Sequence, residues 1–118
     1  MKTLIFGYGI TGKAVENYLK NKSIEYLIYD DNKNVLLDIE KELLFDESQI
    51  NIIDEIVISP GINPGHKQIK NFGTKKIITD IDLFSREFKG KFIGVTGTNG
   101  KTTFVNLLTD FLISKGFN

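Results

Sequence analysis

Several residue types are scarce or balanced in this chain of 118 residues, and each scarcity excludes a class of protein. Cysteine is absent, which excludes disulfide bonds and any cysteine-ligated zinc site. Acidic and basic residues number 15 each, so no net charge favours nucleic acid or an anionic membrane. No apolar run approaches the ~18 residues that a membrane-spanning helix needs. With 41% hydrophobic and 25% charged residues, we expect a soluble, cytoplasmic globular protein.

The first stretch with a chemical signature is Gly7-Tyr8-Gly9-Ile10-Thr11-Gly12. The apolar run Leu4–Phe6 precedes it, and apolar residues at helical spacing follow as far as Leu19. In such a loop the first glycine makes a tight turn, the second lets the backbone approach a diphosphate, and the third allows close packing of helix on strand. A second apolar run ends in Asp30, about twenty residues on, where this kind of nucleotide-binding unit expects an acid. Asp30 or Asp31 would accept hydrogen bonds from a ribose or a base edge; alternatively, Asp30 only closes a strand as a turn residue.

Four short apolar runs, near residues 3–6, 26–29, 55–58 and 75–79, alternate with helical or turn-rich segments over residues 1–90. This alternation predicts an α/β domain with a parallel sheet covered on both faces. Right-handed crossovers make it a Rossmann-like, doubly wound sheet.

The segments between the later strands predict further helices. Residues 35–44 have the apolar spacing of an amphipathic helix, and residues 45–53 predict a short strand followed by a helical turn. Residues 80–88 predict another helix, capped by Thr79 or Asp80. Its expected apolar face consists of Ile81, Phe84 and Phe88.

The loop Ser59-Pro60-Gly61-Ile62-Asn63-Pro64-Gly65 follows the third strand and contains both prolines of the chain. A rigid loop at the carboxyl end of a parallel strand is where open α/β sheets bind ligands. It is equally well explained as a connection kept short by proline. His66, the single histidine, follows this loop without an acidic or serine partner nearby in the sequence. We therefore expect His66 to be a solvated residue at a helix start and not a catalyst.

A second glycine loop, Gly97-Thr98-Asn99-Gly100-Lys101-Thr102-Thr103, lies late in the chain. The apolar run Phe92–Val95 leads into it, and a helical pattern follows it up to Lys115-Gly116, a typical helix ending. Strand, loop and helix together predict the start of a P-loop domain that occupies residues 91–118 and binds ATP or GTP.

The residue types of this second loop suit a nucleoside triphosphate. Backbone N–H groups around Gly97 and Gly100 would cradle phosphates. Lys101 would place a cation on the outer phosphates, and Thr102 a hydroxyl on Mg²⁺. The usual motif has an outer glycine where this chain has Val95, so an ordinary strand-to-helix turn is the alternative.

Four segments in this order resemble the Mur ligases of peptidoglycan synthesis. They are the two glycine loops, Ser59-Pro60-Gly61-Ile62 and Asp80-Ile81-Asp82-Leu83-Phe84. The resemblance covers essentially the whole chain. Folylpolyglutamate synthetases share the second loop, whereas the first loop and the Asp80–Phe84 segment point to the D-glutamate-adding branch of the family.

The resemblance implies two sites. Residues 1–90 would bind the UDP of UDP-N-acetylmuramoyl-L-alanine and not a dinucleotide cofactor; the implied residues are Gly7, Gly9, Ile10, Thr11, Gly12, Asp30, Asp31 and Gly61. Ile10 and Thr11 would meet the diphosphate through their backbone, Asp30 and Asp31 the uracil, and Gly61 would lie along the nucleotide. Family members can carry a hydroxyl and then an arginine after the acid, where this chain has Asp31 and Asn32. The implied ATP site is Gly97, Thr98, Asn99, Gly100, Lys101, Thr102 and Thr103, with Lys101 catalytic and Thr102 on magnesium.

The implied reaction is ATP-driven amide formation for cell wall biogenesis. The L-alanyl carboxylate attacks the γ-phosphate of ATP, and the amine of D-glutamate then displaces phosphate from the acyl phosphate. In the family the D-glutamate site lies in a later domain, so we expect this chain to lack that site and to be inactive as a ligase alone. We expect the apolar surfaces of its last strand and helix to pack on the first domain, to self-associate or to be disordered. The first glycine loop alone also admits an NAD-dependent oxidoreductase or a non-enzymatic nucleotide-binding regulatory domain.

Overall fold

The computed structural model describes residues 1–91, 93–95 and 100–117 of the chain. Two compact units, Met1–Phe88 and Lys89–Asn118, are each described by themselves. The elements of the first unit, with η for 3₁₀ helices, are β1 (Lys2–Phe6), α1 (Ile10–Asn21), β2 (Glu25–Tyr29), η1 (Lys33–Leu36), η2 (Lys41–Leu43), η3 (Glu47–Ile52), β3 (Glu55–Ile58), α2 (Lys67–Lys70), β4 (Lys76–Thr79) and α3 (Asp80–Ser85).

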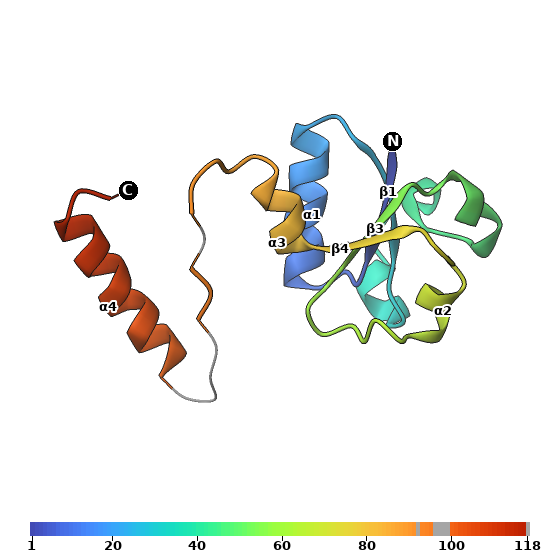
Figure 1. The fold of residues 1–118 in the computed structure, drawn as a ribbon. Helices are drawn as coiled ribbons and strands as arrows, with labels where there is room; N and C mark the ends of the chain where they lie inside the picture. Colours follow the sequence, from blue (N-terminus) through green and yellow to red (C-terminus); the bar gives the residue numbers. More distant parts are fainter. Residues whose placement is uncertain (92, 96–99, 118) are drawn as a thin grey trace. The chain divides into compact units, whose positions relative to one another are not determined.

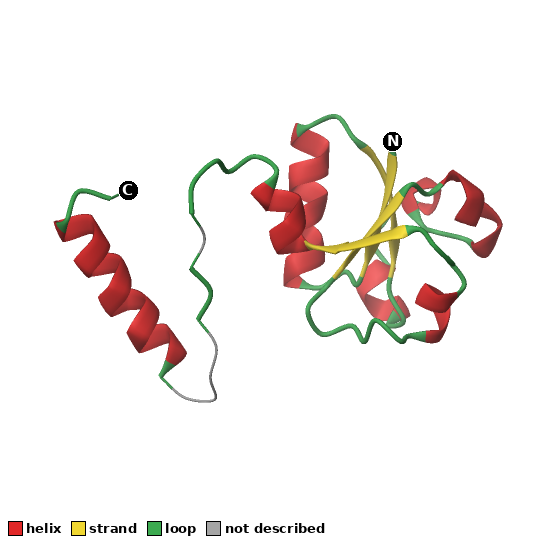
Figure 2. Ribbon diagram, viewed as in Figure 1, coloured by secondary structure: helices red, strands yellow, loops and turns green. Residues whose placement is uncertain are grey.

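The four strands form one parallel sheet in the order β2-β1-β3-β4 (Figures 1 and 2). Leu4 of β1 lies opposite Leu27 of β2 on one side and Ile56 of β3 on the other. The chain goes from β1 outward to β2 and returns to the opposite side of β1, so the winding direction reverses between β1 and β3. The α/β class and the parallel sheet predicted from the sequence are confirmed, and such a reversal is where open α/β sheets bind ligands.

Alternate side chains of the strands build two apolar cores, one on each face of the sheet. Helices α1 and α3 lie on one side and α2 on the other (Figure 1). The core beneath α1 and α3 contains Ile5, Val15, Leu19, Ile28, Val57, Ile78 and Leu83. The opposite core contains Leu4, Phe6, Leu27, Ile53, Ile56, Ile58, Ile69 and Phe72. Because both faces are covered, β3, which lies between β1 and β4, is buried along its whole length, as predicted from its sequence.

The prediction of an amphipathic helix over residues 35–44 is wrong. The segment instead forms the short 3₁₀ helices η1 and η2, separated by residues 37–40, and Glu40 at the end of this gap has a non-helical ψ of 137°. Leu44 then makes a parallel bridge to Ile28, and the Phe45 N–H donates to the Ile28 carbonyl at 2.9 Å. Pairing with the outer edge of β2 therefore overrides the helical periodicity. The helical turn expected within residues 45–53 is confirmed as η3, whereas the short strand expected there is wrong: residues 45–53 form no strand, and the isolated bridge at Leu44 lies just before them.

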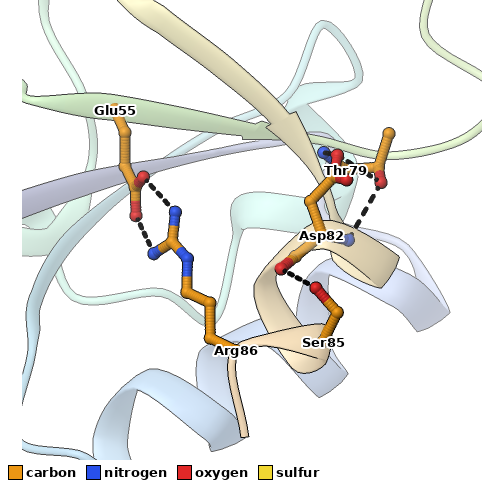
Figure 3. Close-up of polar contacts among 5 residues, drawn as sticks. All are labelled: Glu55, Thr79, Asp82, Ser85 and Arg86. Carbon is orange, nitrogen blue, oxygen red and sulfur yellow. Dashed lines mark hydrogen bonds and ion pairs between the residues drawn. The ribbon is translucent and has the colours of Figure 1, made fainter. Parts of the chain in front are cut away.

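Helix α3 begins with a capping box (Figure 3). The Thr79 hydroxyl accepts the Asp82 N–H at 3.3 Å, and the Asp82 carboxylate accepts the Thr79 N–H at 2.9 Å, which confirms Thr79 as the cap. Of the expected apolar face, Phe84 packs against the core as predicted, but Ile81 and Phe88 are 63% and 53% exposed. The fully buried residue of the helix is Leu83, which the prediction did not include. The helix ends at Ser85, so Phe88 does not continue its face.

The described part of the second unit contains one helix, α4 (Lys101–Ser114), as the sequence predicts. It ends as expected at Lys115 and Gly116, and Gly116 has a φ of 89°. Residues 93–95 form no strand, contrary to expectation, and Phe92 lies outside the described residues. A strand forms by pairing with another strand, and the described residues of this unit include no strand that could pair with residues 93–95. None of the helices described is both long and apolar enough to cross a membrane.

Candidate functional site

The glycine loop after β1 has the conformation that its sequence predicts. Gly7 has a φ of +99°, a backbone region that side chains with a Cβ atom rarely adopt. A Cβ atom placed on Gly12 would lie 2.1 Å from the Gly7 carbonyl oxygen, so only glycine allows α1 to approach the turn this closely. The structural roles predicted for these two glycines are confirmed. A Cβ atom on Gly9 would meet none of the described atoms within 4 Å, so the backbone there faces open space.

The first turn of α1 presents backbone donors at this loop. Its N-cap is Gly9, which supplies no side-chain cap, and the Lys13 N–H donates to the Gly9 carbonyl at 3.0 Å. The amides of Ile10, Thr11 and Gly12 precede that bond and therefore lack intrahelical acceptors. The first turn contains no acidic residue. Free N–H groups at the positive end of a helix form a binding site for anions such as phosphate.

A cleft of about 360 Å³ opens at the carboxyl ends of β1 and β3, at the reversal of winding. It brings together three segments that the sequence analysis singled out separately: the glycine loop, the end of β2 and the proline-containing loop after β3. Its lining residues are Gly7, Gly9, Ile10, Thr11, Asp30, Ser59, Pro60, Gly61 and Ile62. The loop after β3 is therefore part of the cleft wall in addition to being a short connection.

Ser59 joins the two loops. Its hydroxyl donates to the Gly7 carbonyl at 3.1 Å, and its backbone N–H donates to the Phe6 carbonyl at 3.0 Å. A Cβ atom on Gly7 would lie 2.8 Å from the Ser59 hydroxyl oxygen. The two sides of the cleft are thus held together by direct contact and not only through the sheet.

Asp30 ties the end of β2 to the glycine loop. One carboxylate oxygen accepts the Tyr8 N–H and the other accepts the Asn32 N–H, both at 2.7 Å. Asp30 is therefore a turn residue, the alternative left open by the sequence, and it also lines the cleft. A carboxylate oxygen has two lone pairs, so each oxygen retains capacity to accept from a ligand.

Asp31 and His66 form a pair that sequence reasoning missed. The His66 Nε2 lies 2.7 Å from Asp31 Oδ2, while the Tyr29 hydroxyl donates to Asp31 Oδ1 at 2.8 Å. The His66 Nδ1 accepts the Gln68 N–H at 3.1 Å, which leaves Nε2 as the protonated nitrogen that donates to Asp31. The hydrogen bonds from Tyr29 and then His66 lower the pKa of Asp31. The expectation of a solvated, unpartnered histidine is wrong: the partners are 35 residues apart in sequence, and only the parallel sheet brings β2 and the β3 loop together.

Comparison with known proteins decides the family. The sequence model of the N-terminal domain of MurD-like Mur ligases matches residues 1–79, which contain the whole cleft described above. The chain therefore belongs to the MurD-like Mur ligases. This confirms the resemblance predicted from its four sequence segments.

Individual relatives agree with this MurD-like assignment. A UDP-N-acetylmuramoylalanine–D-glutamate ligase of Rickettsia prowazekii (strain Madrid E) is 40% identical over 124 residues, which cover 97% of this chain and 27% of the relative. The ligase of the same name from Aquifex aeolicus (strain VF5) is 36% identical over 119 residues, covering 99% of this chain and 26% of the relative. The chain thus spans about a quarter of the length of these curated relatives.

The second glycine loop of this MurD-like chain is described only in part. Gly97, Thr98 and Asn99, three of the expected ATP-binding residues, lie outside the described residues. Gly100 is the N-cap of α4 with a left-handed φ of 75°, and the exposed residues Lys101, Thr102 and Thr103 form its first turn without an acidic neighbour. This arrangement suits an anion at the helix start.

Proposed function

We propose that residues 1–88 bind the UDP group of a UDP-N-acetylmuramoyl substrate in the cleft between the glycine loop and the Ser59–Ile62 loop. One observation carries the proposal: the first turn of α1, whose amides are free, lies in the same cleft as Asp30 and Gly61, at the point where the winding reverses. The curated relatives carry the names of ligases that act on UDP-N-acetylmuramoylalanine. Membership of this family favours the ligase over the oxidoreductase and regulatory alternatives.

The chemistry of the cleft suits the parts of such a ligand. The diphosphate accepts hydrogen bonds from the amides of Ile10 and Thr11 and gains from the dipole of α1. Gly9 leaves room for its approach, since no described atom would contact a side chain there. The nucleoside extends toward the end of β2, where Asp30 and Asp31 offer carboxylate oxygens to ribose hydroxyls or to the N–H of uracil. Gly61 forms the opposite wall.

We further propose that the second unit contributes to a phosphate site for the co-substrate ATP. The glycine cap and the first turn of α4 fit that role, with Lys101 near the outer phosphates and the Thr102 hydroxyl available to Mg²⁺. In the whole ligase, transfer of the γ-phosphoryl group of ATP to the L-alanyl carboxylate gives ADP and an acyl phosphate. The amine of D-glutamate then forms the amide bond and releases phosphate. Positioned cations and backbone amides serve this reaction by neutralising the charge of the transferring group.

Calorimetric titration of the 118-residue chain tests the proposal for the first unit. UDP and UDP-N-acetylmuramoyl-L-alanine are expected to bind at one site, while NAD is expected to bind more weakly or not at all. Chemical shift changes should concentrate at the amides of Gly9, Ile10, Thr11 and Gly61. Binding of NAD with indifference to both uridine nucleotides would overturn the proposal.

A further inference from the structure

The glycine loop is held by a buried hydrogen bond outside the cleft. Tyr8, between Gly7 and Gly9, is only 6% exposed, and its hydroxyl donates to Glu16 Oε2 of α1 at 2.5 Å. The Tyr8 backbone N–H donates to Asp30 at 2.7 Å. The one residue with a side chain between the two flexible glycines is therefore fixed both through its backbone and through its ring.

Glu16 is the centre of this arrangement. It is 9% exposed, and its second oxygen accepts the Tyr26 hydroxyl at 2.9 Å and pairs with Lys20 Nζ at 3.0 Å. Burial acts to raise the pKa of Glu16, but hydrogen bonds from Tyr8, Lys20 and Tyr26 outweigh it and lower the pKa below its usual value. Burial and the neighbouring Glu16 raise the pKa of Tyr8. At neutral pH the pair is thus a carboxylate acceptor and a phenol donor.

We propose that Glu16 is a positioning residue for nucleoside diphosphate binding, acting through Tyr8 on the backbone of Gly7–Gly9. This inference rests on the function proposed above. Glycines lose more conformational freedom on ordering than other residues, so a loop with two of them binds tightly only if something else orders it beforehand. The Tyr8–Glu16 bond does so from the far side of the loop, which leaves the amides of Ile10 and Thr11 open to the diphosphate.

The chain contains a matched control for this role. Tyr26 donates to the same carboxylate as Tyr8 but lies on β2 and not in the glycine loop. Tyr8→Phe and Tyr26→Phe each remove one hydroxyl that donates to Glu16, and each leaves the aromatic ring in place. If Glu16 only stabilises the fold, both variants weaken stability and neither changes ligand affinity selectively. If Glu16 positions the loop, Tyr8→Phe alone weakens binding.

The experiment titrates UDP into the wild-type chain, Tyr8→Phe, Tyr26→Phe and Glu16→Gln, with thermal melts to establish that each variant is folded at the titration temperature. We expect the dissociation constant of UDP to rise about three- to tenfold in Tyr8→Phe and to stay within about twofold of wild type in Tyr26→Phe. Glu16→Gln retains an acceptor oxygen and should fall between them. In the ligand-free protein, the Gly9 amide should shift and broaden in Tyr8→Phe but not in Tyr26→Phe.

The outcomes separate this inference from the function on which it rests. If the wild-type protein does not bind UDP, both the proposed function and the positioning role of Glu16 are overturned. Wild-type protein that binds UDP, with Tyr8→Phe binding equally well, overturns the positioning role and leaves the proposed function standing. Equal weakening in both phenylalanine variants also overturns it, because the effect would then come from the fold. Should Tyr8→Phe fail to fold, the comparison of Glu16→Gln with Tyr26→Phe decides by the same criterion.

Discussion

Arg86 makes two parallel hydrogen bonds to Glu55, from Nη1 to Oε1 at 2.8 Å and from Nη2 to Oε2 at 2.7 Å (Figure 3). Glu55 opens β3 and its side chain is 4% exposed, whereas Arg86 follows the last residue of α3 and its side chain is 34% exposed. The pair fastens the end of the helix to the amino end of the sheet. It lies away from the cleft, which is at the carboxyl ends of the strands.

Removing the arginine should destabilise the first unit. Arg86→Ala leaves a buried carboxylate unpaired, and the loss in free energy of unfolding is expected to be about 2 kcal/mol, below the full cost of breaking a buried pair because Arg86 is one-third exposed. Urea unfolding followed by circular dichroism measures it. Lys22→Ala is the control: it breaks the Lys22–Glu87 pair, whose side chains are 43% and 49% exposed, and should change stability little. Equal effects would mean that burial does not distinguish the two pairs.

Alanine substitutions of Gly12 and Gly9 should have different effects: the first should lower stability, and the second should weaken ligand binding. Gly12→Ala places a methyl group 2.1 Å from the Gly7 carbonyl oxygen, so the backbone of the turn or the helix must shift, and a loss of about 3 kcal/mol in unfolding free energy is expected. The methyl group of Gly9→Ala would contact no described atom, so the loss in unfolding free energy should stay below about 1 kcal/mol, a typical value for replacing an N-cap residue. Gly9→Ala should nevertheless weaken UDP binding, because the methyl group occupies the approach to the backbone. Unchanged affinity in Gly9→Ala would show that the diphosphate does not lie there.

Thr3 offers a substitution that should stabilise the protein. Its side chain is completely buried in β1, and its hydroxyl is the one buried side-chain polar atom without a hydrogen-bond partner among the described residues. Thr3→Val keeps the shape and removes a hydroxyl whose desolvation is not compensated, so unfolding free energy should rise by about 1 kcal/mol. Thr3→Ser, which keeps the hydroxyl and deletes the methyl group, should lower it. A less stable valine variant would mean that the hydroxyl is solvated by a water inside the core.

The parts that sequence reasoning predicted are those set by local chemistry. The four strands follow from continuous apolar runs, and the roles of Gly7 and Gly12 follow from their spacing after β1. The cleft itself follows from the rule that ligands bind where the winding reverses. In each case the decisive residues lie close together in the chain or at a fixed place in the topology.

The parts that it missed depend on contacts between distant segments. Residues 35–44 have helical apolar spacing, but at the end of this segment Leu44 forms a bridge to the edge strand β2 and the Phe45 N–H donates one hydrogen bond to it, which is incompatible with one continuous helix. The Asp31–His66 and Tyr8–Glu16 pairs leave no periodic signal, because each joins polar residues whose partner is chosen by the fold. Leu83 rather than Ile81 is buried in α3, since the sheet and not the sequence sets the rotation of so short a helix.

The hydrogen bonds to Asp31 make a prediction about acid stability. Bonds from Tyr29 and then His66 lower the pKa of Asp31 from its ordinary value of 3.8. Because the folded-state pKa lies below the unfolded-state value, Asp31 stabilises the fold at a pH above about 4 and loses this contribution as the pH falls through the folded-state pKa. Asp31→Asn should therefore be less stable than wild type at pH 6, and the difference should shrink in urea titrations at successively lower pH. Asn34→Ala, a change in the same segment that alters no carboxylate, should leave the pH dependence unchanged. A constant difference between Asp31→Asn and wild type down to pH values of about 2 would mean that the Asp31 pKa is the same in the folded and unfolded states, and that its two hydrogen bonds favour the charged form no more than water does.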